Sequence, residues 1–103
     1  MLNGKDQVLV CAGLPWRTTV DIAQETAFVN KLEYTEAHDP VVYLHLAQLK
    51  AEQMVEEHCF GDAKRPTLWR LTRAGQAQQE LLIAANPRIA VAREDFLFAG
   101  CPI

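Results

Sequence analysis

The sequence predicts a single, mainly helical α+β domain, in which three helices precede a two-stranded β-hairpin and another helix follows it. Helix-capping residues stand at Thr18 and Thr72, each just before a segment with helical character. From Thr67 to Leu71, apolar and polar residues alternate after a loop with glycine and proline, as in the second strand of a hairpin. A chain of 103 residues, 50% of them hydrophobic, suffices for one domain with its own core and not for two.

The first two helices are predicted from spacing and capping. Residues 4–12 place Val8, Leu9 and Ala12 on one helical face before Gly13 interrupts the pattern. A second helix is expected to begin at Thr18, because Thr18-Thr19-Val20-Asp21 matches the capping-box pattern. Its inner face would consist of Ile22, Ala23, Thr26 and Val29. Residues 30–39 show no clean period, so either this helix is extended or a loop follows it.

The third helix is predicted from a start signal and a buried stripe. Asp39-Pro40 is typical of a helix start, with aspartate as the N-cap and proline at the first helical position. The apolar stripe consists of Val42, Leu46 and Leu49. The helix is expected to end near Glu52-Gln53.

A hairpin and a final helix are expected after it. Residues 54–58 and 67–71 are the two strands, with residues 59–66 as the loop. Thr72 can cap a helix that runs to about Ala85, where Asn86-Pro87 ends it. We therefore expect one domain over residues 1–87 and a C-terminal tail over residues 88–103 that packs on it or forms a dimer interface. The apolar residues of this tail are Ile89, Val91, Phe96, Leu97 and Phe98.

Two motifs in this arrangement carry a resemblance to a known family. Leu46 and Leu49, three residues apart, lead into a short turn and strand. After the hairpin, Trp69-Arg70-Leu71-Thr72-Arg73-Ala74-Gly75 matches an aromatic-x-Leu-Thr-x-x-Gly junction between strand and helix. With these motifs, residues 42–75 resemble the second half of a bacterial winged helix-turn-helix domain of the MarR- or PadR-like kind, and Thr18–Ala23 is similar to the start of its second helix. The resemblance covers roughly residues 4–82. It implies an α+β, mainly α fold with three helices, a two-stranded β-hairpin wing and a C-terminal helix.

Two features depart from the family pattern. Members usually have glycine after the third helix, where a residue with positive φ closes it, whereas this chain has Gln53. Gln53 must therefore bear strain or form a different turn. Residues 28–39 are also longer than the usual tight turn between the second and third helices.

The resemblance implies a small DNA-binding protein, expected to be a transcriptional regulator that acts on double-stranded DNA as a homodimer. In such a protein the third helix lies in the major groove and the wing contacts the phosphate backbone or the minor groove. Gln48 could pair with adenine, while Tyr43 and His45 could reach phosphates or base edges. The candidate DNA-binding residues are Arg17, Thr18, Tyr43, His45, Gln48, Lys50, Lys64, Arg65 and Arg70. No cofactor is implied.

Charge is unevenly distributed along the chain. Ten lysines and arginines against 13 acidic residues give a net charge of −3, which provides no overall attraction to nucleic acid. However, the segment from Lys64 to Arg73 holds four cationic residues and no acidic residue. We therefore expect phosphate contacts to be confined to one basic edge of an otherwise acidic body.

A different function remains open for the third helix. Its exposed face should include Val41, Tyr43 and Leu44. Exposed apolar residues more often mark a protein contact than a DNA contact. The alternative is therefore a winged-helix module that binds another protein through this face.

Other classes of function find little support in the sequence. A glycine-rich phosphate loop, a nucleophile elbow and an HExxH motif are all absent, so no enzyme is expected. Cys11, Cys59 and Cys101 lack paired spacing, and the adjacent His58-Cys59 would point to opposite faces of a strand, so neither disulfides nor a metal site is expected. Cys59 could act as a redox sensor, although an inert thiol is the simpler interpretation. The apolar stretches are too short to span a membrane, and we expect a cytoplasmic protein.

Overall fold

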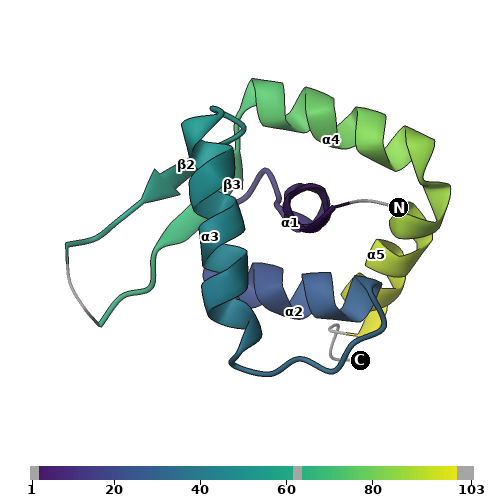
Figure 1. Ribbon diagram of the computed structural model, residues 1–103, viewed down its shortest axis with the longest axis horizontal. Coiled ribbons are helices and arrows are strands. Elements are labelled where there is room, and N and C mark those ends of the chain that lie inside the picture. Colours follow the sequence, from purple (N-terminus) through teal and green to yellow (C-terminus); the bar gives the residue numbers. More distant parts are fainter. Residues whose placement is uncertain (1–2, 62–63, 100–103) are drawn as a thin grey trace.

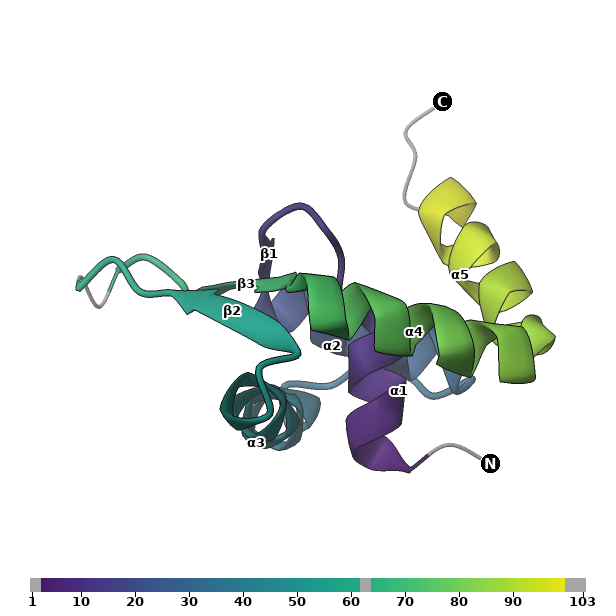
Figure 2. The same cartoon turned by 90° about the horizontal axis from the view of Figure 1, so that it is seen from above.

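The structure is a computed structural model that describes residues 3–61 and 64–99, the last three as backbone only. Its helices are α1 (Gly4–Cys11), α2 (Thr19–Val29), α3 (His38–Ala51), α4 (Arg73–Ala85) and α5 (Pro87–Ala99), and its strands are β1 (Arg17–Thr18), β2 (Val55–His58) and β3 (Leu68–Leu71). Helix α1 lies at the centre, framed by α2, α3, α4 and α5, and the β2–β3 hairpin projects outward beyond α3 (Figure 1). Seen from above, the hairpin and α5 extend at opposite ends of the molecule (Figure 2).

The predicted mainly helical α+β fold with a hairpin wing is confirmed, but its sheet has three strands and not two. Strand order is β1-β3-β2, and both neighbours run antiparallel to β3. The added strand β1 pairs Arg17 with Trp69 and Thr18 with Leu68. Two residues are too few to show an alternating pattern, so nothing in the sequence signals this strand.

The two predicted caps are confirmed. The Thr18 hydroxyl accepts a hydrogen bond from the Asp21 backbone N–H at 3.1 Å, and the Thr72 hydroxyl accepts one from the Gly75 N–H at 3.0 Å. Each cap satisfies a backbone donor that the first turn of its helix leaves unpaired.

The predicted start of the third helix is wrong. Helix α3 begins at His38 with Ala37 at the N-cap position, so Asp39 and Pro40 already lie in the first turn. The Asp39 carboxylate accepts a hydrogen bond from the Tyr34 hydroxyl at 2.7 Å, and this loop contact explains why it does not act as the cap. Proline is tolerated in a first turn, where backbone N–H groups have no helical partner.

Both departures from the family pattern have structural outcomes. Helix α2 ends at Val29, so a loop and not an extended helix connects it to α3. Gln53 has φ 63° and thus adopts the left-handed conformation that glycine adopts most readily. Lys31, at the start of the loop, has φ 58°.

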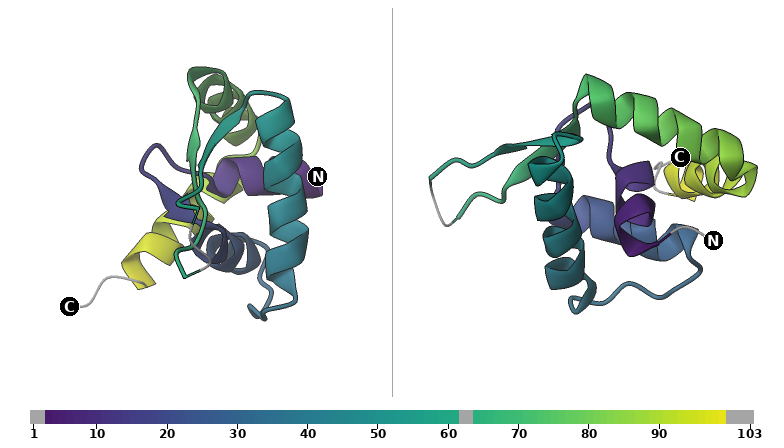
Figure 3. Two further views of the ribbon diagram at one scale, coloured as in Figure 1. Left: turned by 90° about the vertical axis from the view of Figure 1, so that its left-hand side faces the viewer. Right: turned by 45° about the horizontal axis from the view of Figure 1, so that its top comes forward.

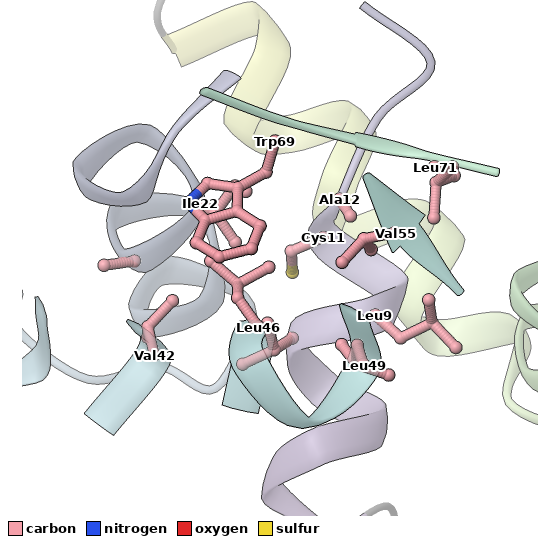
Figure 4. Packing of buried hydrophobic residues seen from close by; sticks show 12 residues of the cluster. Leu9, Cys11, Ala12, Ile22, Val42, Leu46, Leu49, Val55, Trp69 and Leu71 are labelled. Atoms are coloured by element: carbon pink, nitrogen blue, oxygen red, sulfur yellow. The ribbon is translucent and has the colours of Figure 1, made fainter. Parts of the chain in front are cut away.

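The core is built around Trp69 of the wing. Its indole ring is fully buried between Ile22 of α2 and Leu46 of α3 (Figure 4), and its Nε1–H donates to the Thr19 hydroxyl at 2.9 Å. All three predicted stripe residues of α3 are buried. On α2 the buried residues are Ile22, Ala23, Glu25 and Ala27, while the predicted Thr26 and Val29 are only half-buried.

Most of the C-terminal tail is helical, a conformation that the sequence left open. Helix α5 packs against α2, where the Phe96 and Phe28 rings lie 5.4 Å apart and Arg93 pairs with Glu25 at 3.2 Å. It lies on the far side of the body from the wing (Figure 3). The side chains of Leu97 and Phe98, and residues 100–103 with Cys101, lie outside the description. The domain boundary at residue 87 and the dimer interface remain predictions.

Candidate nucleic-acid interface

The exposed face of α3 is apolar toward its N-terminal half. Val41 is 53% exposed, Tyr43 46% and Leu44 63%. The Tyr43 ring stands edge-on to Trp69 with centroids 5.7 Å apart, so it is partly fixed by the core. Leu44 is therefore the residue of this face that is most exposed and least constrained by the core.

The polar candidates on α3 are held in different ways. The half-buried His45 packs against Gly4 of α1, and its Nδ1 lies 3.3 Å from Oε1 of the exposed Gln48. Lys50 pairs with Glu57 of β2 at 3.1 Å, which links the end of α3 to the wing. Gln48 is thus exposed, whereas His45 is turned toward the body.

The N-terminus of α2 holds the two upstream candidates. Thr18 caps the helix. Arg17 is directed into the body, where its guanidinium donates to the Cys11 carbonyl and lies 3.5 Å from the buried carboxylate of Glu25. Arg17 thus has an observed structural role, and its predicted phosphate contact would require these bonds to be exchanged.

The wing carries its cations near the tip and at its base. Lys64 and Arg65 are exposed next to the hairpin tip, and the Arg65 guanidinium lies 4.9 Å from the centroid of the Phe60 ring. Arg70, farther back on β3, pairs with Glu56 of β2 at 3.3 Å. Glu56 of the neighbouring strand thus offsets the charge of Arg70 at the base of the wing.

Aromatic rings line the outer face of the sheet, a feature that sequence reasoning missed. The Arg70 guanidinium lies 4.4 Å from the centroid of Trp16, and the Trp16 and His58 rings are 5.8 Å apart. His58 in turn meets Phe60 edge-on at 4.6 Å. The alternation of side chains along β2 and β3 could have indicated this outer face, because Arg70 and Glu56 are paired on the side of the sheet opposite to Trp69.

Acidic residues beside the start of α3 were also missed. A shallow groove between α2 and α3 is lined by Thr19, Val20, Tyr34, Glu36, Asp39, Pro40 and Tyr43. The hydrogen bond from Tyr34 to the Asp39 carboxylate raises the pKa of the tyrosine hydroxyl to about 12. Glu36 and Asp39 would repel phosphates that approached this end of the helix.

The thiols and the possible metal ligands are dispersed. Burial raises the pKa of the Cys11 thiol to about 12, so this side chain is a small apolar core residue with little thiolate character. Cys59 is exposed, with its Sγ 3.5 Å from the Thr67 hydroxyl. Within residues 3–61 and 64–99, no group of three His, Cys, Asp or Glu side chains could hold a metal ion. Over the same residues, no helix is long and apolar enough to cross a membrane.

The fold is similar to that of a solved regulator. No model of a protein family matches the sequence, and no curated protein matches it either. Among solved structures, the "X-ray structure of PadR-like Transcription factor from bacteroid fragilis" superposes with a TM-score of 0.59 at 16% identity, over 89% of this chain and 87% of that chain. The chain thus has the winged-helix fold of a PadR-like transcription factor.

Proposed function

We propose that the protein is a DNA-binding transcriptional regulator that contacts the phosphate backbone through its wing and the major groove through α3. The observation that carries this proposal is the projecting hairpin with Lys64 and Arg65 near its tip, beyond the exposed face of α3 (Figure 1). Phosphate contacts from such cations supply most non-specific affinity for DNA. Gln48 and, in part, Tyr43 are the side chains offered for base contact.

A homodimer is part of this proposal. One winged-helix module reads too few base pairs for specificity, and two modules on one face of the duplex would read twice as many. Leu81 of α4 and Val91 of α5 are 66% and 60% exposed, which supports α4 and α5 as the surface where two copies meet. This surface would place the wings at the outer ends of the dimer.

Removal of the two wing-tip cations tests the DNA proposal. The double variant Lys64→Ala/Arg65→Ala should bind all DNA sequences more weakly, and the slope of log affinity against log salt should fall by about two. The measurement is fluorescence anisotropy on a pool of genomic duplexes at several salt concentrations. Lys5→Ala/Lys31→Ala removes the same charge from positions outside the wing and outside α4 and α5, and serves as the control. Equal affinities for the two double variants, or binding by the wild type that salt does not weaken, would contradict the proposal.

A second candidate function is a protein-binding module, and the acidic groove is the observation that favours it. Glu36 and Asp39 disfavour DNA at the start of α3, while Leu44 and Val41 offer an apolar contact. Under this alternative, Leu44→Ala should abolish binding of a partner protein and leave the thermal unfolding temperature unchanged.

Glu36→Gln separates the two candidates. If DNA lies against α3, loss of this exposed charge should strengthen DNA binding several-fold, because one phosphate repulsion is removed. If α3 binds a protein instead, DNA affinity should not change. The measurement is the same anisotropy titration, with Glu94→Gln on α5 as the matched loss of one exposed acid.

A further inference from the structure

A cavity of about 290 Å³ lies behind α3, between this helix, α1, α2 and the loop over residues 30–37. Much of its wall is aliphatic. The aliphatic side chains that line it include Val8, Ala23, Ala27, Leu32, Val41 and Val42. Leu32 and Val41 are 58% and 53% exposed, so large apolar groups at this site remain in water while the cavity is empty. Burial of such groups by an apolar occupant would be favourable.

Hydrogen bonds at both ends of the loop keep the cavity open. At the near end, the Leu32 N–H donates to the Ala27 carbonyl at 2.8 Å, and Lys31 holds its left-handed conformation. At the far end, the Thr35 N–H donates to Nδ1 of His38 at 3.0 Å. These bonds fix both ends of the loop that lines the cavity.

The polar groups of the wall are neutral. Among residues 3–61 and 64–99, no Asp, Glu, Lys or Arg side chain lines the cavity. The lining does include the imidazoles of His38 and His45. Nδ1 of His38 lies 3.0 Å from the backbone nitrogen and 3.1 Å from the carbonyl oxygen of Thr35. His45 has Nδ1 3.3 Å from the Gln48 amide oxygen. Together with the side-chain amides of Gln7 and Asn30, these rings give the wall both donors and acceptors of hydrogen bonds, but no counter-charge for an ion.

Volume and chemistry together specify the occupant. An apolar cavity of about 150 Å³ accommodates benzene, so the present cavity is about twice the size that one ring needs. We propose that it binds a small, uncharged bicyclic aromatic molecule with one polar N–H or O–H group, of the size of indole. A charged analogue would lose its hydration without gaining a partner.

An occupant would fix the position of α3. It would touch α3 through Val42 and His45, α2 through Ala23 and Ala27, and the loop through Leu32. Binding would therefore stabilise the present spacing of these elements. Any effect on DNA affinity rests on the proposed function, whereas binding itself does not.

The test uses indole as the probe, with indole-3-acetate as its charged counterpart, on the full chain. Indole should raise the thermal unfolding temperature with a saturable dependence on concentration, and it should shift amide resonances of residues around the cavity. Ala27→Leu, which fills the cavity from α2, should weaken indole binding at least about tenfold. Ala84→Leu adds the same side chain at an exposed position of α4 and should leave binding unchanged. Indole-3-acetate should bind more weakly than indole to the wild type.

Three results would overturn the proposal. One is an unfolding temperature that does not change, or that changes without saturating; another is unchanged indole affinity in Ala27→Leu. The third is a set of shifted resonances centred on the open groove between α2 and α5, which Val29, Ile89 and Val91 line. Resonance mapping on the wild type decides the matter even if Ala27→Leu does not fold, and neither measurement involves DNA.

Discussion

Replacement of Gly75 by alanine is expected to destabilise the protein by at least about 3 kcal/mol, although alanine normally favours a helix over glycine. A Cβ atom at Gly75 would overlap the Met54 carbonyl oxygen and lie 2.8 Å from the carbonyl carbon. Both atoms belong to the backbone, so a side-chain rotation cannot relieve the overlap. Either α4 or the turn after α3 must move.

That turn is held by several contacts that the movement would break. The Thr72 N–H donates to the Met54 carbonyl at 3.0 Å, and the Thr72 hydroxyl donates to the Gln53 carbonyl at 2.6 Å. Gln53 is already in the left-handed conformation. The turn therefore cannot relieve this strain at low cost, and we expect the strain to lower the free energy of unfolding.

Urea unfolding of Gly75→Ala, followed by circular dichroism, measures this effect. Gly61→Ala is the matched control, because Gly61 has φ 70° but its Cβ would have open space among the described residues. It should cost only about 1 kcal/mol from conformation alone. A gain in stability for Gly75→Ala, as helix propensity by itself predicts, would show that the close approach to Met54 does not exist in solution.

The strand-to-helix junction illustrates what the sequence can predict. Thr72 as a cap and Gly75 as part of the motif are both identifiable from local pattern, because a cap and a close approach each demand one type of residue. The same holds for Trp69 and Leu71, whose alternation with Arg70 assigns their faces. Structure adds the partner of each residue, which the pattern does not contain.

The positions of the candidate DNA contacts were harder to predict, because they depend on pairs that are distant in sequence. Arg17 bonds to Glu25 and to the carbonyl of Cys11, and only the packed fold makes these contacts possible. His45 turns toward Gly4 for the same reason. The sequence pattern placed Arg17 just before α2 and His45 on α3, and it could not show that both side chains would face inward.

Removal of the buried carboxylate of Glu25 is the other change with a large expected effect. Glu25 is 1% exposed and pairs with Arg17 at 3.5 Å and with Arg93 at 3.2 Å, through the same oxygen atom. Its loss leaves two partly buried guanidinium groups that share no anion. Glu25→Ala should therefore cost about 3 kcal/mol, the range found when one partner of a buried pair is removed.

The cost should be accompanied by release of α5. Arg93 and the Phe28–Phe96 contact join α5 to α2, so Glu25→Ala should speed hydrogen exchange at the amides of α5 more than at those of α4. Glu94→Ala removes an exposed carboxylate next to Arg93 and should change stability by no more than about 0.5 kcal/mol. Arg93→Ala alone should cost less than Glu25→Ala, because Arg17 still neutralises Glu25.

A double-mutant cycle between Glu25 and Arg93 then isolates their interaction, and we expect a coupling of about 1–3 kcal/mol. Additive effects, with a loss below about 1 kcal/mol for Glu25→Ala, would mean that water screens this carboxylate as it screens a surface pair. In that case α5 would be held to the winged-helix body by its apolar contacts alone. A strong coupling would instead show that the Glu25–Arg93 pair, together with the Phe28–Phe96 contact, holds α5 to α2.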